Sequence, residues 1–170
     1  MAVLTKKEIL AKIKTGEIKI EPLNKPALGP ASYDLHLGNK FRVFKSVKEI
    51  FIVTERAEFE KVTKLVEVKR NFLLMPGQTA HGITQEKITL PDDICGWIEG
   101  RSRFGRLGLM VHITSGFIQP GSSGYQVLEI NNAGPMPLSL NPGLAICQII
   151  FEETKGEAKY EGRFKNQQTP

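Results

Sequence analysis

The chain has 170 residues, of which 41% are hydrophobic and 24% are charged, and its formal net charge is +5 at pH 7. These values are typical of a single globular domain with a substantial core, and they argue against a disordered chain. No apolar run approaches the roughly 18 residues that a membrane span needs, and the basic residues do not form the long runs typical of nucleic-acid binding.

The N-terminal sequence M-A-V-L-T-K-K-E-I-L has no apolar core long enough for a secretory signal, which favours the cytoplasm. Cys95 and Cys147 are far apart in apolar surroundings, so we interpret them as buried thiols of a reducing compartment. The three histidines (His36, His81 and His112) are isolated as well, and we expect no zinc site.

One short helix is predicted near the start of the chain. Thr5-Lys6-Lys7-Glu8 has the pattern of a capping box, apolar residues follow at helical spacing, and Gly16 is placed to end the helix. Three prolines interrupt regular structure between residues 18 and 30. The alternating segment 31–38 then predicts a strand.

Short alternating or apolar runs dominate the rest of the chain, separated by turn signals such as Met75-Pro76-Gly77 and Asn141-Pro142-Gly143. We expect further strands at residues 41–44, 50–53, 65–68, 72–75, 94–98, 109–113, 126–130, 136–140 and 146–151. The polar stretch 54–64 fits a loop or a brief helix. Many short strands with Pro-Gly turns predict an all-β sandwich or barrel.

The last residues differ in composition from the rest. Residues 155–170 are polar and charged, so we expect them to be disordered unless something binds them. We therefore divide the chain into a β domain with its N-terminal helix, residues 1–154, and a C-terminal tail, residues 155–170.

The stretch from residue 100 to residue 129 combines glycines, arginines and one acid. Its first part contains Gly100, Arg101, Arg103, Gly105, Arg106 and Gly108. Glycine lets the backbone approach a ligand closely and arginine presents a planar fork of donors, so this part favours a phosphorylated small molecule. Glu129 lies among apolar residues of an expected strand, where a charged acid needs a partner or a task. Alternatively, Glu129 faces solvent and the arginines form an ordinary solvated face.

A series of motifs runs through nearly the whole chain. They are Ser32-Tyr33-Asp34-Leu35, Leu90-Pro91-Asp92, Gly100-Arg101-Ser102, Arg106-Leu107-Gly108-Leu109, His112-Ile113-Thr114, Pro120-Gly121, Leu128-Glu129, Pro142-Gly143 with Gln148, and Asn166-Gln167-Gln168. In this order and spacing they resemble the deoxycytidine triphosphate (dCTP) deaminase branch of the trimeric dUTPase superfamily. The resemblance implies a distorted jelly-roll protomer in a homotrimer, or in two associated trimers, with active sites between subunits.

The resemblance also implies a reaction, the hydrolytic removal of the 4-amino group of dCTP to give dUTP and ammonia for pyrimidine deoxynucleotide synthesis. It implies no catalytic metal, with Mg²⁺ only as the counter-ion of the triphosphate. Glu129 matches the general acid/base, Ser102 a serine that positions the attacking water, and Arg106 an arginine needed in the site. The substrate-binding candidates are Arg101, Arg103, Thr114, Ser115, Gln119, Tyr160, Arg163 and Gln167, with the tail closing over the nucleotide. On the residues alone, Arg106 also fits a structural ion pair and Ser102 an ordinary turn.

The chain departs from the family pattern at three positions. Gln119 stands where the family has an aspartate associated with the deoxyribose, Arg103 replaces a common serine, and Ser115 replaces a common alanine. Ser115-Gly116-Phe117 resembles the bifunctional branch, which also hydrolyses dUTP to dUMP and pyrophosphate. We favour a deaminase that stops at dUTP, with the bifunctional enzyme as the alternative. The Gln119 substitution keeps open a third reading, a nucleotide-binding regulator with weak catalysis.

Overall fold

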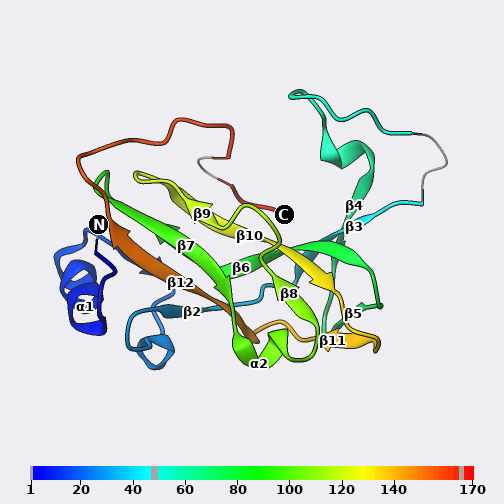
Figure 1. Ribbon diagram of the computed structural model, residues 1–170, viewed down its shortest axis with the longest axis horizontal. Coiled ribbons are helices and arrows are strands. Elements are labelled where there is room, and N and C mark those ends of the chain that lie inside the picture. The colour runs from blue at the N-terminus through cyan, green and yellow to red at the C-terminus, as the bar shows by residue number, and fades with distance from the viewer. Residues whose placement is uncertain (1, 47–49, 165–166) are drawn as a thin grey trace.

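The computed structural model describes residues 2–46, 50–164 and 167–170, and Figure 1 shows their arrangement. The elements in chain order are α1 (Lys6–Thr15), β1 (Lys19–Glu21), the 3₁₀ turn η1 (Lys25–Ala27), β2 (Tyr33–His36), β3 (Lys40–Phe44), the 3₁₀ turn η2 (Phe59–Lys61), β4 (Thr63–Glu67), β5 (Phe72–Leu74), β6 (Thr79–Thr89), β7 (Ile94–Gly100), α2 (Ser102–Gly105), β8 (Leu109–Val111), β9 (Phe117–Ile118), β10 (Ser123–Asn132), β11 (Leu138–Leu140) and β12 (Ala145–Glu153). The expected all-β class with one short N-terminal helix is confirmed. None of the helices in these ranges is long and apolar enough to cross a membrane.

The predicted N-terminal helix is α1, and its ends follow the sequence. Thr5 is the N-cap residue and Gly16 ends the helix in a left-handed conformation with φ 80°. The capping box itself does not form, because the Thr5 side chain makes no cap hydrogen bond. The Thr5 carbonyl instead accepts from the Ile9 amide at 2.9 Å, and Ile9 is fully buried.

Two antiparallel sheets contain most of the strand residues. One has the strand order β4-β3-β6-β10-β8 with β1 paired to the far end of β6, and the other has the order β2-β12-β7-β9. A small third sheet pairs β5 with β11. The longest strand, β6, pairs with β1, β3 and β10, so it is the centre of the first sheet.

A single core cluster joins the two larger sheets. Along β12 and β10 the buried positions alternate with partly exposed ones, and the buried side chains meet in that cluster. Its fully buried members include Leu35, Phe41, Leu128, Ile130 and Phe151. Cys95 and Cys147 are free thiols, as predicted, and burial raises the pKa of both.

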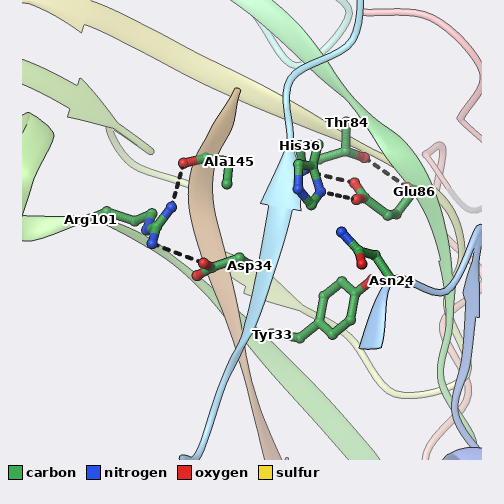
Figure 2. Close-up of polar contacts among 8 residues, drawn as sticks. All are labelled: Asn24, Tyr33, Asp34, His36, Thr84, Glu86, Arg101 and Ala145. Carbon is green, nitrogen blue, oxygen red and sulfur yellow. Dashed lines mark hydrogen bonds and ion pairs between the residues drawn. The ribbon is translucent and has the colours of Figure 1, made fainter. Parts of the chain in front are cut away.

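A buried hydrogen-bonded pair of side chains also connects the sheets. His36 at the end of β2 places Nδ1 2.5 Å from Oε1 of Glu86 on β6, and the His36 amide donates to Oε2 of Glu86 at 2.9 Å. Glu86 is only 2% exposed. Figure 2 shows this pair beside Thr84, whose hydroxyl donates to the Glu86 carbonyl at 2.8 Å. The carboxylate therefore has a partner on each oxygen, as a buried charge requires.

The strand predictions are wrong for one run, and three strands are missing from them. Residues 50–53 do not form a strand, and Ile50, Ile52 and Val53 are 94%, 77% and 86% exposed. An apolar, β-branched run becomes a strand only where a sheet edge accepts its hydrogen bonds, and no strand of the described chain pairs with it. Conversely, β1, β6 and β9 were not predicted. The remaining runs fall on strands within a few residues, and the stretch 54–64 contains the short turn η2.

Candidate active site

A pocket of about 390 Å³ lies between the first sheet, the segment 112–119 and the C-terminal tail. Five of the predicted site residues line it, namely Ser115, Gln119, Glu129, Tyr160 and Gln167. Two histidines that the sequence analysis treated as isolated, His81 and His112, line it as well. The pocket therefore brings an acid, imidazoles and main-chain groups of a loop into one space.

Glu129 is held in place by the loop opposite its strand. Its Oε2 accepts hydrogen bonds from the Thr114 amide at 2.9 Å and from the Thr114 hydroxyl at 2.8 Å. The Glu129 amide donates to Nδ1 of His112 at 2.9 Å. Because an amide only donates, Nδ1 of His112 must be the acceptor, and the proton of the neutral ring sits on Nε2. Glu129 is therefore a partnered acid at a pocket wall, and its role as general acid/base stays a prediction.

His81 is the cross-strand neighbour of Glu129. In the register of the first sheet, His81 pairs with Glu129 on β10 and with Arg42 on β3. Burial is the main cause that lowers the pKa of His81, the Glu129 carboxylate opposes this shift, and Arg42 and His112 add to it. His81 is therefore neutral at pH 7 and separates the charges of Arg42 and Glu129.

The turn after β9 supplies the sugar-side candidate Gln119. Its carbonyl accepts from the Ser122 hydroxyl at 2.6 Å, which closes the turn, and its side chain is exposed at the pocket. Gly121 has φ 69°, and a Cβ there would stand 2.6 Å from Oδ1 of Asp92. A side chain is unfavourable at this turn, because L residues rarely adopt this dihedral angle and the Lys159 Cα stands 3.2 Å from the Cβ position.

The tail lies along this turn and along β10. Its main chain bonds to the domain at three places, where the Ala158 amide donates to Asp92, the Tyr160 amide donates to Pro120, and the Tyr125 amide donates to Gln167. These bonds bring Tyr160 and Gln167 to the pocket. Arg163 instead lies 5.6 Å from the ring centre of Phe164 and does not line the pocket. Asn166 of the tail motif lies outside the described residues.

Arg101 is tied to its own chain. Its Nη2 lies 2.9 Å from Oδ2 of Asp34 on β2, and its Nη1 donates to the Ala145 carbonyl at 2.8 Å. Figure 2 shows the guanidinium reaching both groups across the second sheet. In the isolated chain Arg101 therefore holds β2 and β12 together, and its role toward phosphate stays a prediction.

Ser102, Arg103 and Arg106 belong to the exposed segment around α2. All three side chains are exposed, and none lines the pocket of Glu129. Figure 1 places α2 at the lower edge of the molecule, whereas β9 and the tail lie at the upper edge. Within one chain, Glu129 and the arginine-containing segment around α2 therefore lie on two separate surfaces.

Comparisons with known proteins agree with these observations. Residues 3–154 match the family model described as dCTP deaminase-like. The chain is 39% identical to the dUMP-forming dCTP deaminase of Nocardioides sp., over 98% of this chain and 92% of the relative. It is 40% identical to the dUMP-forming dCTP deaminase of Methanosphaera stadtmanae, over 89% and 79%. A dCTP deaminase of Marinomonas sp. is 39% identical, over 91% and 85%.

Solved structures show the same fold. The 2′-deoxycytidine 5′-triphosphate deaminase of Agrobacterium tumefaciens superimposes with a TM-score of 0.69 at 24% identity, over 88% of this chain but only 47% of that chain. A mutant dUTPase of phage phi11 of S. aureus superimposes with a TM-score of 0.53 at 13% identity, over 86% and 96%. At these identities the likeness extends to the fold alone, and the fold is dUTPase-like.

Proposed function

Because the chain belongs to the dCTP deaminase family, we propose that it hydrolyses the 4-amino group of dCTP and carries the product on to dUMP and pyrophosphate. The observation that supports the first step is the carboxylate of Glu129, oriented by Thr114 at the wall of a pocket. The dUMP-forming relatives and the segment Ser115-Gly116-Phe117 support the second step. The bifunctional alternative is therefore better supported than the deaminase that stops at dUTP.

In the proposed deamination, Glu129 moves protons between water and the leaving amine. Both hydrogen bonds from Thr114 go to Oε2 of Glu129, and Oε1 has none among the described residues. Oε1 is therefore the oxygen that accepts the proton. It takes a proton from water as the oxygen attacks C4 of the cytosine, and it returns the proton to the amine as ammonia leaves. The loop around Ser115 is suited to read the pyrimidine edge, because its main-chain groups are not all used by a sheet.

We propose that a second copy of the chain completes the site. Ser102 and Arg106 are exposed away from the pocket of their own chain, and in a homotrimer they would enter the pocket of a neighbour. There Ser102 would position the attacking water and Arg106 would hold the polar network. Arg101 and Arg103 would face the triphosphate, and Mg²⁺ would arrive with the substrate as its counter-ion.

The tail contributes the remaining substrate contacts. We assign residues 1–154 to the catalytic β domain and residues 155–170 to a segment that closes over the nucleotide, with Tyr160, Arg163 and Gln167 near the phosphates. Gln119 would accept or donate a hydrogen bond to the deoxyribose without the negative charge of the family aspartate. The dUTP step needs a second water in line with the phosphorus atom under attack, and a closed tail would hold it there.

The test is a product assay with purified protein, Mg²⁺ and dCTP, in which dCTP, dUTP and dUMP are separated by chromatography. We expect dUMP with little free dUTP. Accumulation of dUTP alone would establish the deaminase that stops at dUTP. Calorimetric binding of dCTP without any product would instead support the nucleotide-binding regulator.

The matched variant is Glu129→Gln, which keeps the size and the acceptor oxygen of the side chain but cannot carry a proton. We expect its rate of ammonia release to fall at least about a hundredfold, while its affinity for dCTP changes little. Wild-type turnover in this variant would remove Glu129 from the role of general base.

A further inference from the structure

Arg42 on β3 holds the end of the tail, and the proposed chemistry gives it no task. Its Nε donates to the main-chain oxygen of Pro170 at 2.8 Å, and its Nη1 lies 3.4 Å from the hydroxyl of Thr63. The guanidinium carbon stands 5.2 Å from the centre of the Phe59 ring. The planar fork is thus fixed by a neighbouring strand and an aromatic ring while one edge binds the tail.

Pro170 itself lines the pocket beside a cluster of aromatic rings, which we call the slot. The slot consists of Phe44, Phe59 and His81, whose rings meet edge to face, with centres 5.6 Å apart for Phe44 and His81 and 6.0 Å apart for Phe59 and His81. Pro170 is buried, whereas the two residues before it, Gln168 and Thr169, are polar and exposed, and Pro170 lines the pocket together with Phe59 and His81. The buried ring of Pro170 adds an apolar anchor at the end of the tail to the contacts that Tyr160 and Phe164 make at the pocket.

The slot adjoins the proposed base. Arg42, His81 and Glu129 are successive cross-strand neighbours on β3, β6 and β10. Neighbouring strands lie about 4.8 Å apart, so two spacings, or roughly 10 Å, separate the strand positions of Arg42 and Glu129. The end of the tail is therefore fixed at the Glu129 side of the pocket. The neutral His81 between them keeps Arg42 available to the tail.

We propose that Arg42 is a positioning residue, which fixes the end of the tail in the Phe44–Phe59–His81 slot and so holds the pocket closed before the nucleotide binds. This inference rests on the proposed function for its kinetic consequence but not for its structural one. If the tail is already docked, the substrate does not have to order it, and the apparent affinity is not reduced by an undocked population. Without the contact between Arg42 and Pro170, the undocked population lowers the apparent affinity for the nucleotide, and KM rises.

The structural test uses Arg42→Met, which keeps a long side chain but loses the guanidinium, in full-length protein without nucleotide. Hydrogen exchange reports docking through the Tyr125 amide of β10, because this amide donates to the Gln167 carbonyl of the tail. We expect its exchange, and that of the tail amides, to accelerate roughly tenfold or more. The control is Arg70→Met, which removes an exposed arginine outside the strands and the pocket and should change neither.

Comparing Arg42→Met with unchanged Arg42 in a chain that ends at Gln167 separates the Arg42–Pro170 contact from a general effect of Arg42 on β3. In that background Arg42 has no Pro170 to hold, so Arg42→Met should add nothing to the exchange of Tyr125. An equal acceleration in both backgrounds would show that Arg42 acts on the sheet and would overturn the proposal, as would unchanged exchange in the full-length variant.

The kinetic test measures KM and kcat for dCTP in the same variants. We expect Arg42→Met to raise KM roughly fivefold to tenfold with little change in kcat, since only the docked population changes. Arg42→Lys keeps the charge but not the planar guanidinium, and its KM should lie between those of the wild type and of Arg42→Met. A fall in kcat at constant KM would contradict a positioning role. If neither the wild type nor Arg42→Met forms product, the proposed function fails. The hydrogen-exchange result still tests whether Arg42 holds the tail.

Discussion

At the scale of single residues, the electrostatic role of His81 has a consequence for stability. Burial depresses the pKa of His81 in the folded chain below its ordinary value, and the titratable or charged groups that face it are Glu129, Arg42 and His112. As the pH falls below about 6.5, the unfolded chain takes up the proton first, so folding loses stability through the window down to the folded pKa. Above about 6.5 the contribution is fully present.

We therefore expect His81→Asn to flatten the pH dependence of stability. The measurement is the free energy of urea unfolding at pH 7.5 and pH 5.5 for both proteins. The wild type should lose more stability between these two conditions than the variant does. Equal losses would assign the acid sensitivity to other groups.

The same residue marks a limit of the sequence. Glu129 and Gln119 were found because they stand inside recognisable motifs. His81 lies on β6, a strand with polar residues and Gly82 in its middle that carries no such motif. Its importance arises from the strand register, which places it beside Glu129 and Arg42, and register depends on long-range pairing that one sequence does not display.

At the scale of elements, one glycine determines how α2 and β8 join. Gly108 has φ 82°, and a Cβ there would stand 2.4 Å from the Gly134 nitrogen and 2.5 Å from the Gly134 Cα. Its carbonyl accepts from the Ala133 amide at 2.8 Å, which fixes the exposed α2 against the turn after β10. A side chain at this position would meet backbone that cannot yield easily.

We expect Gly108→Ala to reduce the free energy of unfolding by about 3 kcal/mol, because it combines an unfavourable dihedral angle with a backbone clash. Gly105→Ala is the matched control, since a Cβ at Gly105 meets nothing within 4 Å and lies in α2. That control should be neutral or slightly stabilising. Chemical denaturation of both variants measures the difference, and similar losses would contradict the argument.

Local pattern predicted elements well where an apolar or alternating run is buried in the core. The runs that became β3, β5, β7, β10 and β12 are apolar or alternating and pack in one core. The run 50–53 is just as apolar, yet it remains exposed because no strand edge of the described chain receives it. The buried strand β6 was missed for the opposite reason, since its buried polar residues Thr84 and Glu86 have partners that only the fold supplies.

At the scale of the whole molecule, the hydrogen-bonded pair of His36 and Glu86 connects the two larger sheets. We expect His36→Leu to cost about 3 kcal/mol of unfolding free energy, because it leaves one oxygen of the buried Glu86 carboxylate without its hydrogen-bond partner. The double variant with Glu86→Leu should recover part of this loss, since it removes the stranded charge. Additive losses in a double-mutant cycle by urea unfolding would show that the pair contributes no coupling.

The separation of Glu129 from the exposed α2 leads to a prediction about assembly. If one site uses Glu129 of one copy and Arg106 of the next, then Glu129→Gln and Arg106→Ala damage opposite halves of the site. Each mixed trimer of the two inactive variants, in either ratio, then contains one intact site in three. Mixed trimers isolated with two affinity tags should therefore regain about one third of the wild-type rate of ammonia release.

The control pairs Glu129→Gln with Thr114→Val. Thr114 touches Glu129 within the same chain, so both lesions fall on the same half of the site, and mixing restores no intact site. Recovery in the first mixture but not in the second would establish a site shared between copies. Arg106 of one copy would then lie at the Glu129 pocket of the next. No recovery in either would mean that each chain closes its own site, and α2 would then have to move across the fold to reach Glu129.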